Sequence, residues 1–180
     1  MWIYLILIIV ACVSALTLYV WYSMSAEKSL YGLNDESRYL MGRVCNHLNS
    51  SWDAMGQLVE QMQPYSATSY RRLQQQIEQL KSAQVSTPES VSMQMAALNE
   101  ARQRVDAAVR EHPELNASDE YRSAVGTLEK REKRMKEAAK AYNACVERLN
   151  KLVGNWPSSS VARRNNLFKK KQMNLALGTK

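Results

Sequence analysis

The residues of this chain that could do chemistry are few, and their spacing matches no metal or nucleophile motif. The two histidines, His47 and His112, are far apart, and only Cys45 lies near the first of them. A structural zinc site needs four ligands with local pairs, which this spacing does not supply. Cys45 and Cys145 fall in segments with helical periodicity, where a cysteine usually packs as a small apolar residue. We therefore predict no metal site and no nucleophilic cysteine.

Other catalytic motifs are missing from the sequence. It has no glycine-rich phosphate loop, no Gly-x-Ser-x-Gly elbow and no His-Glu-x-x-His stretch. The acidic pairs Asp35-Glu36 and Asp119-Glu120 stand where carboxylates cap helices or face solvent. We predict that the protein is not an enzyme, has no catalytic or cofactor-binding residues and uses no cofactor.

The composition indicates a single helical domain. The chain has 180 residues, of which only 6 are Gly and 4 are Pro. An α/β enzyme of this size usually needs more of both residues for its turns. The 3 Cys are an odd number, which argues against a disulfide-stapled secreted module.

The first 24 residues have the features of a transmembrane helix. No charged residue occurs from Trp2 to Tyr22, a run that would be about 31 Å long as a helix. The hydrocarbon core of a bilayer is about 30 Å thick. Aromatic residues at both ends match the belts found at membrane interfaces. The predicted interface anchors are Trp2, Tyr4, Tyr19, Trp21 and Tyr22.

Two cleaved alternatives to this uncleaved helix stay open. A signal peptide would begin with a basic region, which this sequence lacks. Residues 9–12 look like a lipoprotein cleavage box, but cleavage there would leave an apolar N-terminus. Beyond the span, Lys28, Arg38 and Arg43 give a basic excess, so the positive-inside rule favours a cytoplasmic body.

Four further segments have helical periodicity, at about residues 25–63, 69–83, 88–111 and 118–153. The first of them can continue the membrane helix directly. We expect Thr87 to cap the third segment, and Gly154 to end the fourth in the left-handed conformation. Pro64 and Pro113 are also expected to end helices, because proline cannot donate the helical hydrogen bond. Pro157 is expected to prevent the helix from resuming after Gly154.

The fourth segment carries a heptad seam in which Glu132 is the only charged residue. We expect Glu132 to pair with an Arg or Lys of another helix. The seam predicts the buried face of an antiparallel bundle, with an intermolecular coiled coil as the alternative. The predicted fold is all-α, an N-terminal transmembrane helix followed by a long antiparallel bundle of about four helices. The even number of passes should return the chain toward the membrane near Asn155. The seam residues are Tyr121, Val125, Leu128, Glu132, Met135, Ala139, Tyr142, Val146, Leu149 and Val153.

Residues 155–180 form a basic tail without an acidic residue. Its cations alternate with bulky apolar residues, a pattern that suits an anionic membrane surface. A solvated, disordered tail is the alternative, and a basic cluster alone does not lead us to expect nucleic-acid binding. The predicted anionic-lipid contacts are Arg163, Arg164, Lys169, Lys170 and Lys171.

The chain resembles the LemA family of bacterial membrane proteins from the membrane helix to about Phe168, and the second half is the most specific part of the resemblance. Residues 111–121 (EHPELNASDEY) are similar to the family segment YPDLKANENF, and residues 155–158 (NWPS) are similar to its FPS end. The similarity continues in register at Leu128, Glu129, Glu132, Arg134, Ala138, Tyr142, Asn143, Val146 and Asn150. The resemblance implies one N-terminal membrane helix (1–24), a LemA-like helical bundle (25–154) and little chemistry.

From these features we expect a non-enzymatic, single-pass protein of the bacterial inner membrane whose bundle is an interaction or scaffold module. Its expected partners are the lipid bilayer and proteins that the sequence does not identify. A divergent branch of the family includes magnetosome-membrane proteins. The alternative is therefore a homo-oligomeric structural protein that organises or shapes membrane, for which the seam and Glu132 could specify the assembly.

Overall fold

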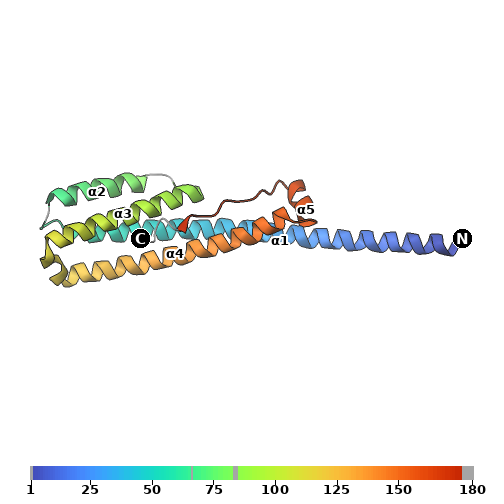
Figure 1. Cartoon of the computed structure of the whole chain (residues 1–180), viewed down its shortest axis with the longest axis horizontal. Coiled ribbons are helices and arrows are strands. Elements are labelled where there is room, and N and C mark those ends of the chain that lie inside the picture. Colours follow the sequence, from blue (N-terminus) through green and yellow to red (C-terminus); the bar gives the residue numbers. More distant parts are fainter. Residues whose placement is uncertain (1, 66, 83–84, 176–180) are drawn as a thin grey trace. The chain divides into compact units, whose positions relative to one another are not determined.

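The computed structural model describes residues 2–65, 67–82 and 85–175, and these residues form helices without a strand. The all-α prediction is confirmed. In chain order the elements are α1 (Trp2–Glu60), α2 (Ala67–Ser82), α3 (Pro88–Glu111), the 3-10 helix η1 (Pro113–Ala117), α4 (Asp119–Gly154) and α5 (Ser158–Arg164) (Figure 1). The chain divides into a first unit, residues 1–38 and 144–171, and a second unit, residues 39–143 and 172–180.

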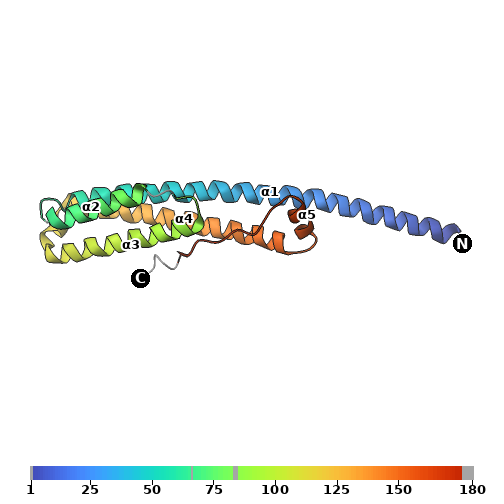
Figure 2. The same cartoon turned by 90° about the horizontal axis from the view of Figure 1, so that it is seen from above.

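Helix α1 is continuous over 59 residues (Figure 2), so the expectation that a body helix continues the membrane helix is confirmed. The helix ends at Glu60, three residues before the predicted end, and turns follow it to Tyr65. Pro64 has no amide hydrogen and disfavours the helical conformation of the residue before it. The break therefore falls upstream of the proline.

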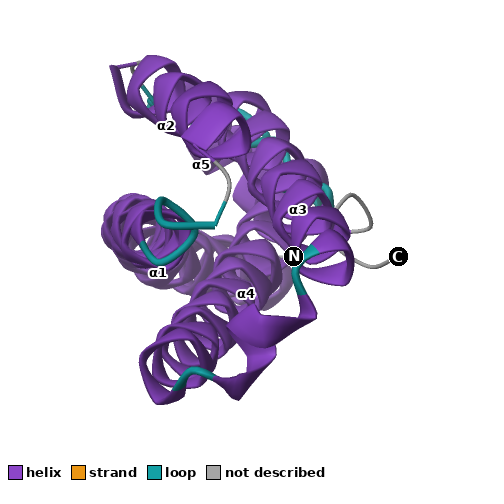
Figure 3. Cartoon of the chain, turned by 90° about the vertical axis from the view of Figure 1, so that its left-hand side faces the viewer, coloured by secondary structure: helices purple, strands orange, loops and turns teal. Residues whose placement is uncertain are grey.

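The second unit contains the end of α1, the helices α2 and α3, and the beginning of α4. Helices α2 and α3 lie side by side in it (Figure 3). The predicted end of the second segment, Ala83, lies outside the described residues. The core of this unit takes one apolar stripe from each helix, as the periodicity predicted. Its buried residues include Leu40, Val44, Leu48, Trp52, Met55, Leu58, Leu73, Ile77, Val91, Met95, Leu98, Val105, Tyr121, Leu128, Met135 and Ala139.

Two helix starts in the second unit follow local sequence signals. The Thr87 hydroxyl accepts a hydrogen bond from the Ser90 amide at 3.1 Å, and the Thr87 amide donates to Ser90 Oγ at 3.1 Å. This capping box confirms the predicted cap of α3. Before α4, Ser118 Oγ accepts from the Tyr121 amide at 3.3 Å. Pro113 opens η1, the short connection between α3 and α4.

Glu132 was expected to pair with an Arg or Lys of another helix, and this partner is Arg102 of α3. Arg102 Nη1 lies 3.0 Å from Glu132 Oε2, and Arg102 Nη2 lies 2.8 Å from Glu129 Oε1. Burial lowers the pKa of the Arg102 guanidinium, but the carboxylates of Glu129, Glu132 and Asp106 together raise it more, so the net shift is upward. The pairing prediction is confirmed within one chain.

Two expectations about the end of α4 were wrong. Gly154 is the last residue of α4, and no glycine in the described part of the chain has a positive φ. The Asn155 amide still donates to the Lys151 carbonyl at 3.1 Å, so the helical bonding continues past Gly154. Pro157 also does not prevent a further helix, because α5 begins at the next residue. A fixed proline φ suits the start of a helix as well as its end.

Candidate membrane interface

The first part of α1 is long and apolar enough to cross a membrane, and α1 is the one helix with this property in the described part of the chain. Its most apolar stretch has no residue buried within the protein. The hydroxyls inside this stretch bond to the helix backbone, Ser14 to the Ala11 carbonyl and Thr17 to the Ser14 carbonyl. Satisfied polar groups and an unpacked apolar surface are what a lipid environment requires.

All five predicted interface anchors lie on this exposed part of α1. Trp2 and Tyr4 lie at its beginning, and Tyr19, Trp21 and Tyr22 lie at its end. Burial begins immediately afterwards with Ser23, Ala26 and Leu30. The change from exposed to buried residues therefore falls within one helical turn of the predicted end of the span.

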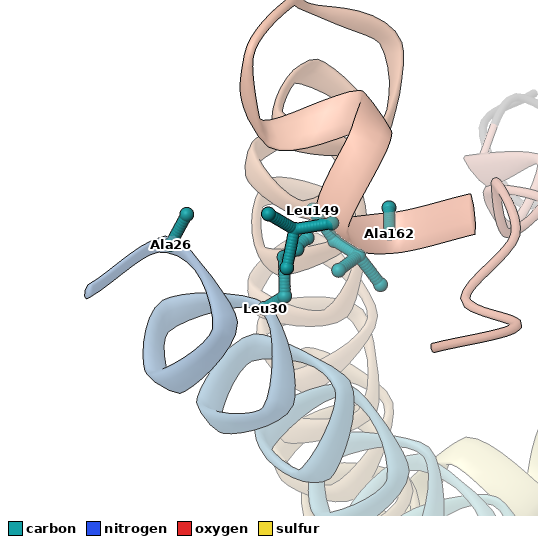
Figure 4. Close-up of a cluster of buried hydrophobic side chains, with 5 residues drawn as sticks. Ala26, Leu30, Leu149 and Ala162 are labelled. Carbon is teal, nitrogen blue, oxygen red and sulfur yellow. The ribbon is translucent and has the colours of Figure 1, made fainter. Parts of the chain in front are cut away.

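Helix α5 packs against α1 directly after this boundary. Ala26 and Leu30 of α1 share a buried cluster with Leu149 of α4 and with Val161 and Ala162 of α5 (Figure 4). Tyr22 Oη and Ser158 Oγ are 3.2 Å apart. The chain after Asn155 is thus beside the end of the predicted span. The prediction that the chain returns toward the membrane end of α1 is confirmed.

A polar contact holds the other end of α5 to the same stretch of α1. Glu27 Oε1 accepts a hydrogen bond from Asn165 Nδ2 at 3.2 Å, and Glu27 Oε2 lies 3.4 Å from Arg164 Nη2. Asn166 follows with a φ of 52°, a left-handed conformation that asparagine tolerates well. The chain thereby turns back after α5.

The chain beyond this turn is held to α4 by two asparagine side chains. In the first unit, Asn150 Nδ2 donates to the Lys170 carbonyl and Asn150 Oδ1 accepts from the Lys170 amide, both at 2.8 Å. In the second unit, Asn143 makes the same pair of bonds to Met173, also at 2.8 Å. These side chains replace the partners that an extended backbone would find in a sheet. The tail is therefore bound to α4 at Lys170 and Met173, and residues 176–180 of the predicted tail lie outside the described residues.

The five predicted lipid contacts fall into two groups. Arg163, Arg164, Lys169 and Lys171 are exposed. Lys170 is half-buried, and its Nζ donates to Ser37 Oγ at 2.6 Å and to the Asn34 carbonyl at 3.5 Å. Burial, followed by the charge of Arg38, lowers the pKa of this ammonium. The Lys170 ammonium thus binds within the first unit.

Two exposed aromatic residues accompany the exposed cations. Trp156 is 79% exposed and Phe168 is 73% exposed. In the sequence, both belong to the bulky apolar residues that alternate with the cations of the tail. Their exposure makes them candidates for contact with a membrane or partner, because aromatic side chains of this size are usually packed.

A cavity of about 280 Å³ in the second unit is the other candidate site. It is lined by Trp52 of α1, by residues of α2 including Gln76, and by residues of α3 including Glu100 and Arg104. Arg104 already bonds Glu100 at 2.5 Å and Gln76 at 2.6 Å. Trp52 Nε1 is buried and has no hydrogen-bond partner in the described part of the chain. The charged groups of the cavity are thus engaged with one another.

The two cysteines of the body are packed, as expected. Cys145 is fully buried, and its thiol donates to the Leu33 carbonyl at 3.4 Å. Cys45 is half-buried and donates to the Val85 carbonyl at 3.9 Å. Burial raises the pKa of both thiols, which disfavours the reactive thiolate.

These features define an all-α protein with a candidate membrane-spanning helix that continues into a helical body. The sequence profile of the LemA family matches residues 41–179. The chain therefore belongs to the LemA family, and the match begins within the body, beyond the candidate span. A search of curated protein sequences finds no match to the chain.

Proposed function

We propose that this protein is a single-pass protein of the bacterial inner membrane, with a non-enzymatic body that binds other proteins as a scaffold on the cytoplasmic side. The observation that carries the proposal is the continuity of α1. The same helix supplies the exposed apolar stretch 2–22 and then the core residues Leu40, Val44 and Leu48. An unbroken helix joins the apolar stretch to the body without an intervening loop.

The outer surface of the body supports a role in protein binding. Exposed polar residues cover one side of α2, where they leave Leu73 and Ile77 to the core. Such a surface can offer hydrogen bonds and charge to a partner without exposing the core. The exposed residues on this side are Arg71, Arg72, Gln74, Gln75, Glu78 and Gln79.

Cross-linking in native membranes followed by mass spectrometry tests the scaffold role. The full chain should give the same few cross-linked proteins in repeated preparations, through the body residues. A variant with charge-reversed Arg71 and Arg72 should lose partners that bind at α2, whereas reversal of Lys130 and Lys133 on α4 is the matched control. A full chain that gives only random, abundant membrane proteins would contradict the proposal.

The side of the membrane is tested by cysteine labelling from outside intact cells. Cys45 and Cys145 are poor reporters because both are packed, so an exposed residue, Ser123, is replaced by cysteine. A membrane-impermeant maleimide should label Ser123→Cys only after the cells are broken. Labelling in intact cells would place the body outside.

The homo-oligomeric alternative loses the support that the seam gave it. Tyr121, Leu128 and Met135 of the seam are buried within one chain, and Glu132 pairs with Arg102 of the same chain. The seam is therefore occupied without a second copy. A detergent-solubilised mass equal to one chain at micromolar concentration would agree with this.

A further inference from the structure

We propose that the α5 segment, residues 156–169, docks on the surface of the bilayer that α1 spans and gathers anionic lipid headgroups there. Arg163, Arg164 and Lys169 would bind the headgroup phosphates, and Trp156 and Phe168 would enter the interface. The proposal rests on the proposed membrane anchoring and adds a second membrane contact to it.

The position of the α5 segment along α1 carries the proposal. Its first residues are fixed at Tyr22 by the 3.2 Å contact between Tyr22 Oη and Ser158 Oγ. The end of α5 is fixed at Glu27 by Arg164 and Asn165. Tyr22 and Glu27 are about 7.5 Å apart along a helix. The headgroup layer beyond the hydrocarbon core is roughly 5–8 Å thick on each side. With Tyr22 at the edge of the core, α5 lies at headgroup height, and residues 156 and 168 lie close to it in the sequence.

The charge of the segment complements an anionic surface. No acidic residue follows Gly154 in the sequence, and Arg163, Arg164 and Lys169 are exposed. The acidic residue that α1 places against the segment is Glu27, which contacts Arg164 at 3.4 Å and leaves a net positive charge. Exposed cations at this height attract anionic lipids, each with about a fivefold effect on affinity at low salt. Lys170 is left out because its ammonium binds Ser37.

The aromatic residues of the segment fit the same surface. Trp156 and Phe168 flank α5 in the sequence and are 79% and 73% exposed. The indole ring combines an apolar body with one N–H donor, a combination that is favourable at a membrane interface. Lipid would remove from water an apolar area that the protein itself leaves uncovered.

Photo-cross-linking of the full chain in bilayers tests the docking. Benzoylphenylalanine replaces Trp156 or Phe168, and in the matched control it replaces Tyr31, an exposed tyrosine about 13 Å beyond Tyr22 along α1. The proteins are reconstituted in vesicles with three parts phosphatidylcholine and one part phosphatidylglycerol. We expect lipid adducts at positions 156 and 168, with at least about threefold higher yield than at position 31. Equal yields at the three positions, or adducts with a second copy of the chain in place of lipid, would overturn the docking.

The lipid composition of the adducts tests the role of the cations. Phosphatidylglycerol should be enriched among the adducts at position 156 by at least about threefold over its bulk fraction. Exchange of Arg163, Arg164 and Lys169 for Gln should return the ratio to the bulk value. The same exchange at Lys130, Lys133 and Lys140, which are exposed on α4, removes equal charge and should leave the ratio unchanged. A ratio equal to bulk in the unmodified segment would overturn the proposed headgroup binding.

A separate position distinguishes this proposal from the anchoring on which it rests. Benzoylphenylalanine at Tyr4, within the exposed stretch of α1, should give lipid adducts if the chain is anchored. Adducts at position 4 without an excess at positions 156 and 168 would overturn the docking alone. A chain without adducts at position 4 would overturn both proposals.

Discussion

Arg102 of α3 and Glu132 of α4 form an ion pair in the second unit, with Arg102 Nη1 3.0 Å from Glu132 Oε2. Only 15% of the Glu132 side chain and 26% of the Arg102 side chain are exposed. The pair therefore lies mostly out of solvent, inside a seam of apolar residues. Its value to the fold depends on both partners being present, because an unpaired charge at such a depth costs more than the pair contributes.

Removal of the cation should therefore differ from removal of one of its two carboxylate partners. We expect Arg102→Leu to lower the free energy of unfolding by about 1–3 kcal/mol, because it leaves two carboxylates without their cation. Glu132→Leu should be neutral or stabilising, since Arg102 keeps Glu129 and the seam gains an apolar residue. Guanidinium denaturation in detergent solution, followed by circular dichroism, measures both. A large loss in Glu132→Leu would contradict this account.

The asparagine that holds the tail should also contribute measurably to stability. Asn150→Ala removes both bonds to the Lys170 backbone, and we expect a loss of about 1–2 kcal/mol. Hydrogen exchange at the Lys170 amide should accelerate more than exchange in the core of the second unit. Asn49→Ala, at an exposed position of α1, is the matched control and should leave both quantities unchanged. An unchanged exchange rate at Lys170 in Asn150→Ala would rule out this role.

The regular elements were predictable because their signals are local. Thr87 and Ser90 cap α3 with two hydroxyls three residues apart, and the seam of α4 repeats with a fixed period. A cationic partner for Glu132 could also be predicted, because a carboxylate among apolar residues needs a cation nearby. Each of these expectations needed only the chemistry of one turn or one helix face.

The contacts that α5 and the tail make with α1 and α4 were less predictable because they join segments that are distant in the sequence. The Tyr22–Ser158 contact joins residues 136 apart in the sequence. Lys170 was grouped with its neighbours as a lipid contact, although its partner Ser37 is 133 residues away. The extended tail has no periodic pattern, so its binding to Asn150 left no sequence signal. Helix α5 was not predicted because Pro157 was expected to prevent further helix, whereas proline also fits the start of a helix.

The buried indole of Trp52 provides a test of packing against hydrogen bonding. Trp52 is fully buried, and its Nε1 has no partner among the described residues. We expect Trp52→Phe to change the free energy of unfolding by less than about 1.5 kcal/mol, since no hydrogen bond is lost. Trp52→Ala should cost about 3–5 kcal/mol through the cavity it leaves. Equal losses in the two variants would indicate that the indole N–H has a partner.

The buried thiol of Cys145 should make the fold more sensitive to alkaline pH. Burial, followed by the negative charge of Glu36, raises the pKa of this thiol above its usual value of 9.0. Between the two pKa values the unfolded chain has lost a proton that the folded chain keeps. The free energy of unfolding therefore falls as the pH rises above 9.0.

Comparison with Cys145→Ala isolates this effect from the other titrating groups. The unmodified chain should lose more stability between pH 7.5 and pH 10, values on either side of the usual thiol pKa of about 9, than the variant does. Chemical denaturation at the two pH values gives the difference. Identical losses in both proteins would show that the thiol does not contribute.

Alkaline carbonate extraction of membranes, with N-terminal sequencing of the extracted chain, tests the central claim that an uncleaved α1 anchors the body. We expect the full chain to stay in the membrane pellet with residues 2–22 attached, and a chain without residues 2–22 to move to the soluble fraction. A mature chain that is soluble and begins beyond Tyr22 would contradict the account.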